Sequence, residues 1–171
     1  QGASVQVLLP VAQSPFGPPG RTKHLGDGLG GSRNQPTQAG PAAVPGPSVL
    51  AGKRVLVIDD ELCFGEFVQE LLVTYGCRAE VQTDVRGAIR RFREASDQFD
   101  AVVVDYAMPG LTGIELSEVL LKSRPNIPII LCTGMVEQVD KERIEYLGIR
   151  AVLRKPVTLP ALLSHLWRCW S

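Results

Sequence analysis

The sequence contains little histidine and cysteine and no long apolar segment. Two histidines and four cysteines occur in 171 residues, and no pair of cysteines shows the close spacing of a zinc or redox motif. We interpret the cysteines as buried or neutral thiols in a reducing compartment. No apolar run reaches the length of a membrane-spanning helix, and the N-terminus lacks the pattern of a signal peptide. These absences predict a cytoplasmic segment without direct membrane contact, whether or not a parent chain is anchored in a membrane.

The chain also lacks an excess of charge of either sign. Lysine and arginine together number 18, as do aspartate and glutamate, so the formal net charge is zero. A nucleic-acid partner would therefore need a local basic patch. Arg86, Arg90, Arg91 and Arg93 share one expected helix, where a solvated basic face is the commoner arrangement. We expect no nucleic-acid partner.

The first 49 residues do not have the pattern of a compact domain. Residues 1–10 hold Val5, Val7 and Leu9 at alternate positions before Pro10, which predicts one short strand. Residues 11–49 are rich in proline and glycine and predict a flexible linker. Because a single strand is not a fold, and because the chain begins with glutamine instead of methionine, we expect a fragment of a longer protein.

From residue 52 onward, short apolar runs alternate with segments of helical periodicity. Runs rich in β-branched residues predict buried strands, and apolar residues at helical spacing predict the helices between them. The strands are expected at 53–59, 77–83, 101–105, 127–133 and 149–153, and the helices at 62–75, 85–95, 112–123, 137–147 and 159–170. This alternation predicts one α/β domain over residues 52–171, a doubly wound five-stranded parallel sheet with five helices.

The ends of the expected strands carry polar residues that a parallel sheet would bring to one edge. They are Asp59 and Asp60 after the first strand, Asp105 after the third, Thr133 after the fourth and Lys155 after the fifth. Three aspartates at close range repel one another unless a cation lies between them. Oxygen ligands favour Mg²⁺, with Mn²⁺ as the alternative, over Zn²⁺. A carboxylate nucleophile, a metal, a lysine and a hydroxyl together meet the needs of phosphoryl transfer.

Each of these residues has a plainer interpretation when it is taken alone. An Asp-Asp pair at a strand end is more often a helix cap or a solvated turn. Thr133 alone would be a strand-end hydroxyl, and Lys155 alone a solvated charge. Their occurrence together, each at its own strand end, favours the phosphoryl-transfer site.

Four motifs resemble the response-regulator receiver family: IDDE at 58–61, VVVDYAMPGLTG at 102–113, LCTG at 131–134 and LRKP at 153–156. The resemblance implies the flavodoxin-like receiver fold, with Asp105 as the phosphoacceptor. It also implies that Thr133 is the hydroxyl that moves toward the phosphoryl group. Lys155 would be the salt-bridge partner of that group, and a cis bond is expected between Lys155 and Pro156.

The resemblance also implies a Mg²⁺ site. Its ligands would be Asp59, Asp60, Asp105 and the backbone carbonyl of Ala107. Two positions depart from common receivers: the aromatic switch residue three positions before Lys155 is replaced by Val152, and Ala107 is too small to reach over a phosphoryl group. We therefore expect signalling through Thr133 instead of an aromatic rotamer change.

The function implied by the resemblance is phosphorelay signalling. Asp105 would accept a phosphoryl group from a phosphohistidine of a histidine-kinase domain, in cis or in trans, and a histidine phosphotransfer protein is a further candidate partner. Residues 1–10 resemble the closing strand of a histidine-kinase ATP-binding domain, so the parent resembles a hybrid sensor histidine kinase, although this segment itself is expected to lack kinase activity.

Two other functions remain open at this point. One is a stand-alone receiver that acts as a phosphorylation-switched protein-binding module. The other is an aspartyl phosphatase, which is disfavoured because such enzymes commonly carry a second aspartate two residues after the nucleophile, where this chain has Ala107.

Overall fold

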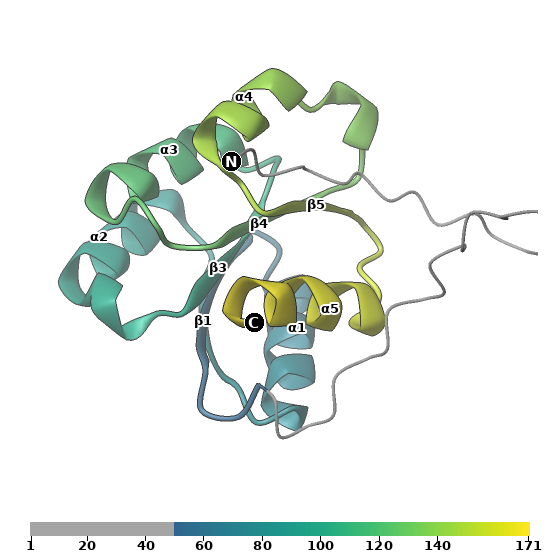
Figure 1. Cartoon of the computed structure of the whole chain (residues 1–171). Coiled ribbons are helices and arrows are strands. Elements are labelled where there is room, and N and C mark those ends of the chain that lie inside the picture. The colour runs from purple at the N-terminus through teal and green to yellow at the C-terminus, as the bar shows by residue number, and fades with distance from the viewer. Residues whose placement is uncertain (1–49) are drawn as a thin grey trace, which may run out of the picture. The chain divides into compact units, whose positions relative to one another are not determined.

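The computed structural model describes residues 50–171, which form a five-stranded parallel sheet with helices on both faces (Figure 1). The elements are β1 (Arg54–Ile58), α1 (Leu62–Thr74), β2 (Arg78–Gln82), α2 (Val85–Ala95), η2 (Ser96–Gln98), β3 (Ala101–Asp105), α3 (Gly113–Ser123), β4 (Ile129–Thr133), η3 (Val136–Gln138), α4 (Lys141–Leu147), β5 (Ala151–Arg154) and α5 (Leu159–Trp170). The strand order is β2-β1-β3-β4-β5 and every neighbouring pair is parallel. The predicted fold class is confirmed. The strand expected at 1–10 and the linker expected at 11–49 lie outside the described residues.

The sheet is buried on both faces because successive strand residues point to opposite sides. Leu56, Val102 and Leu131 contribute to the apolar cluster under α2, α3 and α4. Val55, Val103 and Ile130 contribute to the other cluster, under α1 and α5. Figure 1 shows the same division of the helices between the two faces. Two separate cores therefore fix the strands, and with them the edge of the sheet where the strands end.

The prediction of a helix over residues 137–147 is wrong about where that helix begins. Residues Val136–Gln138 form a 3₁₀ turn, Val139 is extended, and α4 begins only at Lys141. The side chain of Asp140 accepts a hydrogen bond from the backbone amide of Arg143 at 3.0 Å, as an N-cap residue does. Val136 and Val139 are both buried, so the segment before the cap is held by packing of a non-helical backbone.

Two glycines permit close approaches between elements. A Cβ at Gly65 would lie 2.6 Å from Cγ1 of Val81, so glycine lets α1 pack directly on β2. A Cβ at Gly113 would lie 2.4 Å from the carbonyl oxygen of Asp105 and 2.9 Å from Cα of Tyr106. Glycine at 113 therefore lets the first turn of α3 lie against the end of β3. None of the helices between residues 50 and 171 is both long and apolar enough to cross a membrane.

Candidate functional site

Three carboxylates meet at the carboxyl edge of the sheet. Asp59 and Asp60 follow β1, and Asp105 is the last residue of the neighbouring strand β3. One oxygen from each of these three aspartates lies within 4.8 Å of the other two. Asp59 and Asp105 are buried, whereas Asp60 is exposed. The convergence predicted from the strand ends is therefore present, with one side of the cluster open to solvent.

Lys155 joins two of these carboxylates. Its Nζ donates to Oδ2 of Asp59 and lies equally close to Oδ1 of Asp105, with both distances 2.7 Å. The lysine follows β5, and its own backbone amide donates to the carbonyl of Thr133 at 2.8 Å. The bond between Lys155 and Pro156 is cis, as expected. The ammonium group thus links the ends of β1, β3 and β5.

Burial and charge act in opposite directions on these groups. Burial raises the pKa of Asp59, and its hydrogen bonds from Lys155 and from the backbone amide of Glu61 only partly oppose this rise. Burial by itself would lower the pKa of Lys155, but the hydrogen bonds to Asp105 and Asp59 outweigh it, so the pKa of the lysine is raised. The lysine therefore remains an ammonium group at neutral pH.

Thr133 and Ala107 both lie close to Asp105 in the fold. Thr133 is the residue after Cys132, which is the register partner of Asp105 on β4. Its hydroxyl oxygen accepts a hydrogen bond from the backbone amide of Met135 at 3.1 Å. The backbone amide of Ala107 donates to Oδ2 of Asp105 at 2.8 Å, which fixes the free rotation of that carboxylate. Both residues named from the sequence therefore lie next to Asp105.

The donor set fits a hard divalent cation. All the side-chain donors in the cluster are carboxylate oxygens, and neither histidine nor cysteine joins them among the described residues. Such a set suits Mg²⁺ or Mn²⁺, which prefer oxygen ligands and retain bound water. The exposed Asp60 leaves room for that water. The cluster would also leave two negative charges unbalanced if Lys155 were the only cation, because three carboxylates meet one ammonium group.

One residue of the site was not predicted from the sequence. The ring of Phe64, in the first turn of α1, lies under Nζ of Lys155 at 4.1 Å from the ring centroid. The sequence showed Phe64 only as part of the apolar face of a helix, and it does pack against the cluster under α1 and α5. No sequence signal connects it with a lysine 91 residues later.

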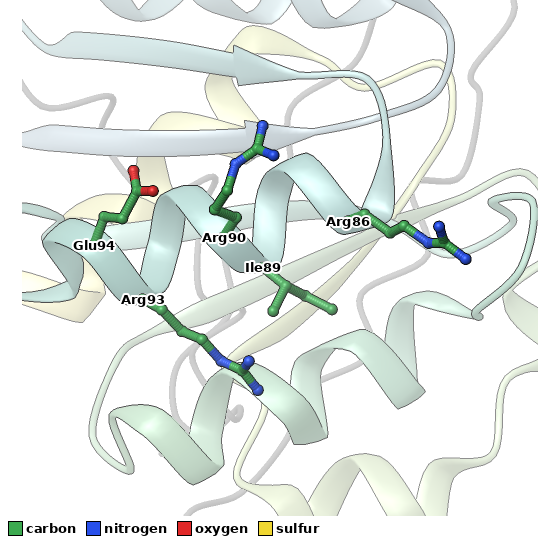
Figure 2. A pocket seen from close by; sticks show the side chains of 5 residues that line it. All are labelled: Arg86, Ile89, Arg90, Arg93 and Glu94. Atoms are coloured by element: carbon green, nitrogen blue, oxygen red, sulfur yellow. The ribbon is translucent and has the colours of Figure 1, made fainter.

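A basic concavity on α2 lies apart from this site. Figure 2 shows Arg86, Arg90 and Arg93 with Ile89 and Glu94 around it, and its volume is about 440 Å³. None of the three arginines forms an ion pair within residues 50–171, whereas Arg91 of the same helix pairs with Glu80 at 2.5 Å. All five lining residues come from one helix, in keeping with the interpretation of a solvated basic face.

The cysteines of the described residues are free thiols, and Cys63 among them is exposed instead of buried. Cys77 and Cys132 are buried, and burial raises their pKa values to about 11 and about 12. Burial also raises the pKa of Cys169. These three thiols are therefore neutral at physiological pH.

The comparisons with known proteins agree with this geometry. The response regulator receiver domain family matches residues 55–166. The transcription factor Skn7 of Candida albicans is 34% identical over 132 residues, which cover 74% of this chain and 22% of that protein. The aerobic respiration control sensor protein ArcB of Escherichia coli is 27% identical over 124 residues, which cover 71% of this chain and 16% of that protein. The chain thus spans less than a quarter of the length of these relatives.

A solved structure shares the fold. The response regulator protein TrrA from Thermotoga maritima, in complex with Mg²⁺-BeF, has a TM-score of 0.60 and 25% sequence identity, and the match covers 68% of this chain and 98% of that one. The fold, the acidic cluster at the strand ends and the family match over residues 55–166 lead to one conclusion. The chain belongs to the response regulator receiver domain family.

Proposed function

We propose that this receiver accepts a phosphoryl group on Asp105 in a Mg²⁺-dependent reaction, with a phosphohistidine as the donor. The observation that carries the proposal is the bridge from Nζ of Lys155 to both Asp59 and Asp105, at 2.7 Å each, inside a cluster of three carboxylates. This arrangement combines a nucleophile with the charges that phosphoryl transfer needs.

The residues would act as follows. A carboxylate oxygen of Asp105 attacks phosphorus, the P–N bond breaks, and its electron pair returns to the imidazole, which takes up a proton from water. The backbone amide of Ala107 donates to Oδ2 of Asp105, so Oδ1, which now contacts Nζ of Lys155, would be the attacking oxygen. Lys155 moves its ammonium group from the carboxylates toward the phosphoryl oxygens. Thr133 donates its hydroxyl proton to one of these oxygens.

A Mg²⁺ ion held by Asp59, Asp60, Asp105 and the carbonyl of Ala107 would neutralise charge on the transferred group. The oxygen-only donor set supports this assignment. The Mg²⁺-BeF complex of TrrA, a relative with 25% identity, supports it as well. Unshifted backbone amide resonances at Asp60 and Asp105 in saturating Mg²⁺ would contradict it.

The test of the proposed function is chemical. With a small-molecule phosphodonor and Mg²⁺, the protein should gain one acid-stable and base-labile phosphoryl group, measured by intact mass. Asp105→Asn should abolish the gain, whereas Asp97→Asn, at an exposed aspartate of η2, should leave it unchanged. Labelling that persists in Asp105→Asn would assign the nucleophile to another residue.

We also propose that the receiver belongs to a hybrid sensor histidine kinase. In this proposal residues 1–10 close an ATP-binding domain, residues 11–49 are a linker and residues 52–171 are the receiver. The proposal is supported by the similarity to the sensor protein ArcB, in which the matched segment makes up 16% of the protein. A histidine phosphotransfer protein would be a second partner of such a receiver.

Two other kinds of parent protein compete with the hybrid kinase, and an experiment can distinguish them. A stand-alone receiver would act as a phosphorylation-switched binding module, and the Skn7 relative, a transcription factor, represents a receiver in a gene-regulatory chain. The coding sequence upstream of Gln1 separates them. A helical His-Glu motif followed by an ATP-binding domain is expected, and its absence would refute the hybrid-kinase proposal.

A further inference from the structure

We propose that Phe64 is a positioning residue for Lys155. By holding the ammonium group of Lys155 in place, its ring increases the rate at which Asp105 accepts a phosphoryl group. The inference rests on the proposed function and adds a residue to it. Nζ of Lys155 lies over the ring of Phe64 at 4.1 Å from the centroid, while it contacts Asp59 and Asp105 at 2.7 Å. The ammonium group is thus held by two carboxylates and one aromatic face.

The fold fixes the ring where the lysine needs it. The backbone amide of Phe64 donates to the carbonyl of Glu61 at 3.0 Å, so the ring belongs to the first turn of α1, shortly after the two aspartates that follow β1. Gly65 allows this helix to lie against Val81 of β2. The segment that carries two of the carboxylates therefore also supplies the aromatic face.

The ring contributes an interaction that a carboxylate does not replace. Two of the three N–H bonds of an ammonium group suffice for Asp59 and Asp105, and the remaining side of Lys155 would otherwise face water. The lysine side chain is only 22% exposed, so the loss of hydration needs compensation. The negative face of an aromatic ring attracts a cation over distances up to about 6 Å, without the strict angle of a hydrogen bond.

This tolerance matters during the reaction. When Asp105 becomes an acyl phosphate, the negative charge moves from its carboxylate to the phosphoryl oxygens. Nζ of Lys155 has to follow this charge while it stays close to the site. A ring face at 4.1 Å lets the ammonium group shift sideways and keep its attraction, which a second directional hydrogen bond would not allow.

The competing interpretation is that Phe64 only packs, because its ring also contacts the apolar cluster under α1 and α5. Fluorination separates the two interpretations, since it weakens the negative face of the ring and barely changes its shape. We would replace Phe64 by 4-fluoro-, 3,5-difluoro- and 3,4,5-trifluorophenylalanine in the full 171-residue chain. Phe67 is the matched control, because it lies on the same helix, is 48% exposed and has no cation over its ring within residues 50–171.

Two readouts are needed. The first is the rate constant for phosphorylation by a small-molecule phosphodonor at saturating Mg²⁺, which should fall with each added fluorine and reach a loss of about fivefold, equivalent to about 1 kcal/mol. The same series at Phe67 should stay within about twofold of the unmodified protein. The second readout is the NMR shift of the ε-methylene protons of Lys155, which the ring of Phe64 should move upfield and which Phe64→Leu should return to its usual position.

The outcomes distinguish the inference from the proposed function. A ring-dependent shift of Lys155 together with a stepwise loss of rate supports the positioning role. A phosphorylation rate that is the same across the Phe64 series, or that rises with fluorination, overturns it and leaves Asp105 as the phosphoacceptor. Phosphorylation that survives Asp105→Asn overturns the proposed function itself, and the inference with it.

Discussion

Gly113 offers the sharpest test of how the fold positions Asp105. The first residue of α3 lies so close to the end of β3 that an added Cβ would stand 2.4 Å from the carbonyl oxygen of Asp105. The same Cβ would stand 2.9 Å from Cα of Tyr106 and from Cδ2 of Leu131. Two of these three contacts are with backbone atoms, which cannot rotate away. Gly113→Ala should therefore push α3 from the sheet or displace Asp105.

The expected magnitude follows from two opposing effects. Overpacking of a well-filled core costs about 1–3 kcal/mol, and a backbone clash at 2.4 Å belongs at the upper end of that range. Alanine in place of glycine recovers up to about 1 kcal/mol of helix propensity, and less at a first turn. We expect Gly113→Ala to lower the free energy of unfolding by about 2 kcal/mol, and to slow phosphorylation of Asp105 as well.

Urea unfolding with paired glycine variants provides the assay. A loss of about 2 kcal/mol corresponds to a fall of about 1 M in the midpoint at an ordinary denaturant dependence. Gly65→Ala should cost less, because the three nearest atoms all belong to the side chain of Val81 and none to the backbone, and because alanine gains full helix propensity inside α1. Gly134→Ala, with nothing within 4 Å, should change stability by less than about 0.5 kcal/mol. Equal midpoints for Gly113→Ala and Gly134→Ala would refute the reasoning.

Three further predictions concern the surface, the pH dependence and the switch. Leu62, which is 53% exposed and lies two residues after Asp60, should border the docking site of the phosphohistidine partner. Leu62→Glu should slow transfer from that partner about tenfold or more and leave the rate with a small-molecule donor unchanged. An equal loss of rate with both donors would contradict this role. Burial lowers the pKa of His165, so the folded state binds fewer protons there than the unfolded state, and stability should fall as the pH drops below about 6.5. His165→Gln should remove this part of the decrease, measured as the difference in urea midpoint from wild type at pH 7.5 and pH 5.5; a difference that does not change with pH would exclude the effect. Phosphorylation should change hydrogen exchange mainly at residues 133–147, and an unchanged rate there with a change confined to Val152 would disprove the proposed route of the signal.

The strands, and the edge of the sheet at which their carboxyl ends meet, were predictable because the signal for each strand is local. A run such as 101–105, with three consecutive valines, strongly favours a buried strand. Parallel strands bring their carboxyl ends to one edge of the sheet. For the same reason the sequence placed Asp59, Asp60 and Asp105 together. The structure agrees with this expectation, since one oxygen of each aspartate lies within 4.8 Å of the other two.

The start of α4 was mispredicted because the helix expected at 137–147 was a mostly polar segment with a clear end before Gly148 but no defined start. Asp140 followed by a charged segment is a typical N-cap, and its side chain accepts the capping bond from the amide of Arg143. Val136 and Val139 are buried on a backbone that is not α-helical. The capping residue was the better guide here.

Lys155 was expected at the same edge as the aspartates, but the aromatic ring beneath its ammonium group could not be predicted in the same way. The ring of Phe64 is 91 residues away from Lys155 in the sequence. Periodicity identifies which face of a helix is apolar, but not which cation lies over one ring of that face. Such contacts depend on how α1 and the segment after β5 pack against the sheet. They become visible only when both elements are in place.

If Asp105 accepts a phosphoryl group as proposed, the charges of the site favour a signal that runs through Thr133. Before phosphorylation, three carboxylates would be balanced by Lys155 and a divalent cation. The acyl phosphate adds about one negative charge at neutral pH, so a further donor has to approach. The hydroxyl oxygen of Thr133 now accepts from the amide of Met135, and its own proton remains free to turn toward a phosphoryl oxygen. Movement of Thr133 would pull on the segment that leads to η3, where Glu137 is paired with Arg154 of β5. Val152 packs against the apolar cluster under α4 and offers no polar atom for the same task.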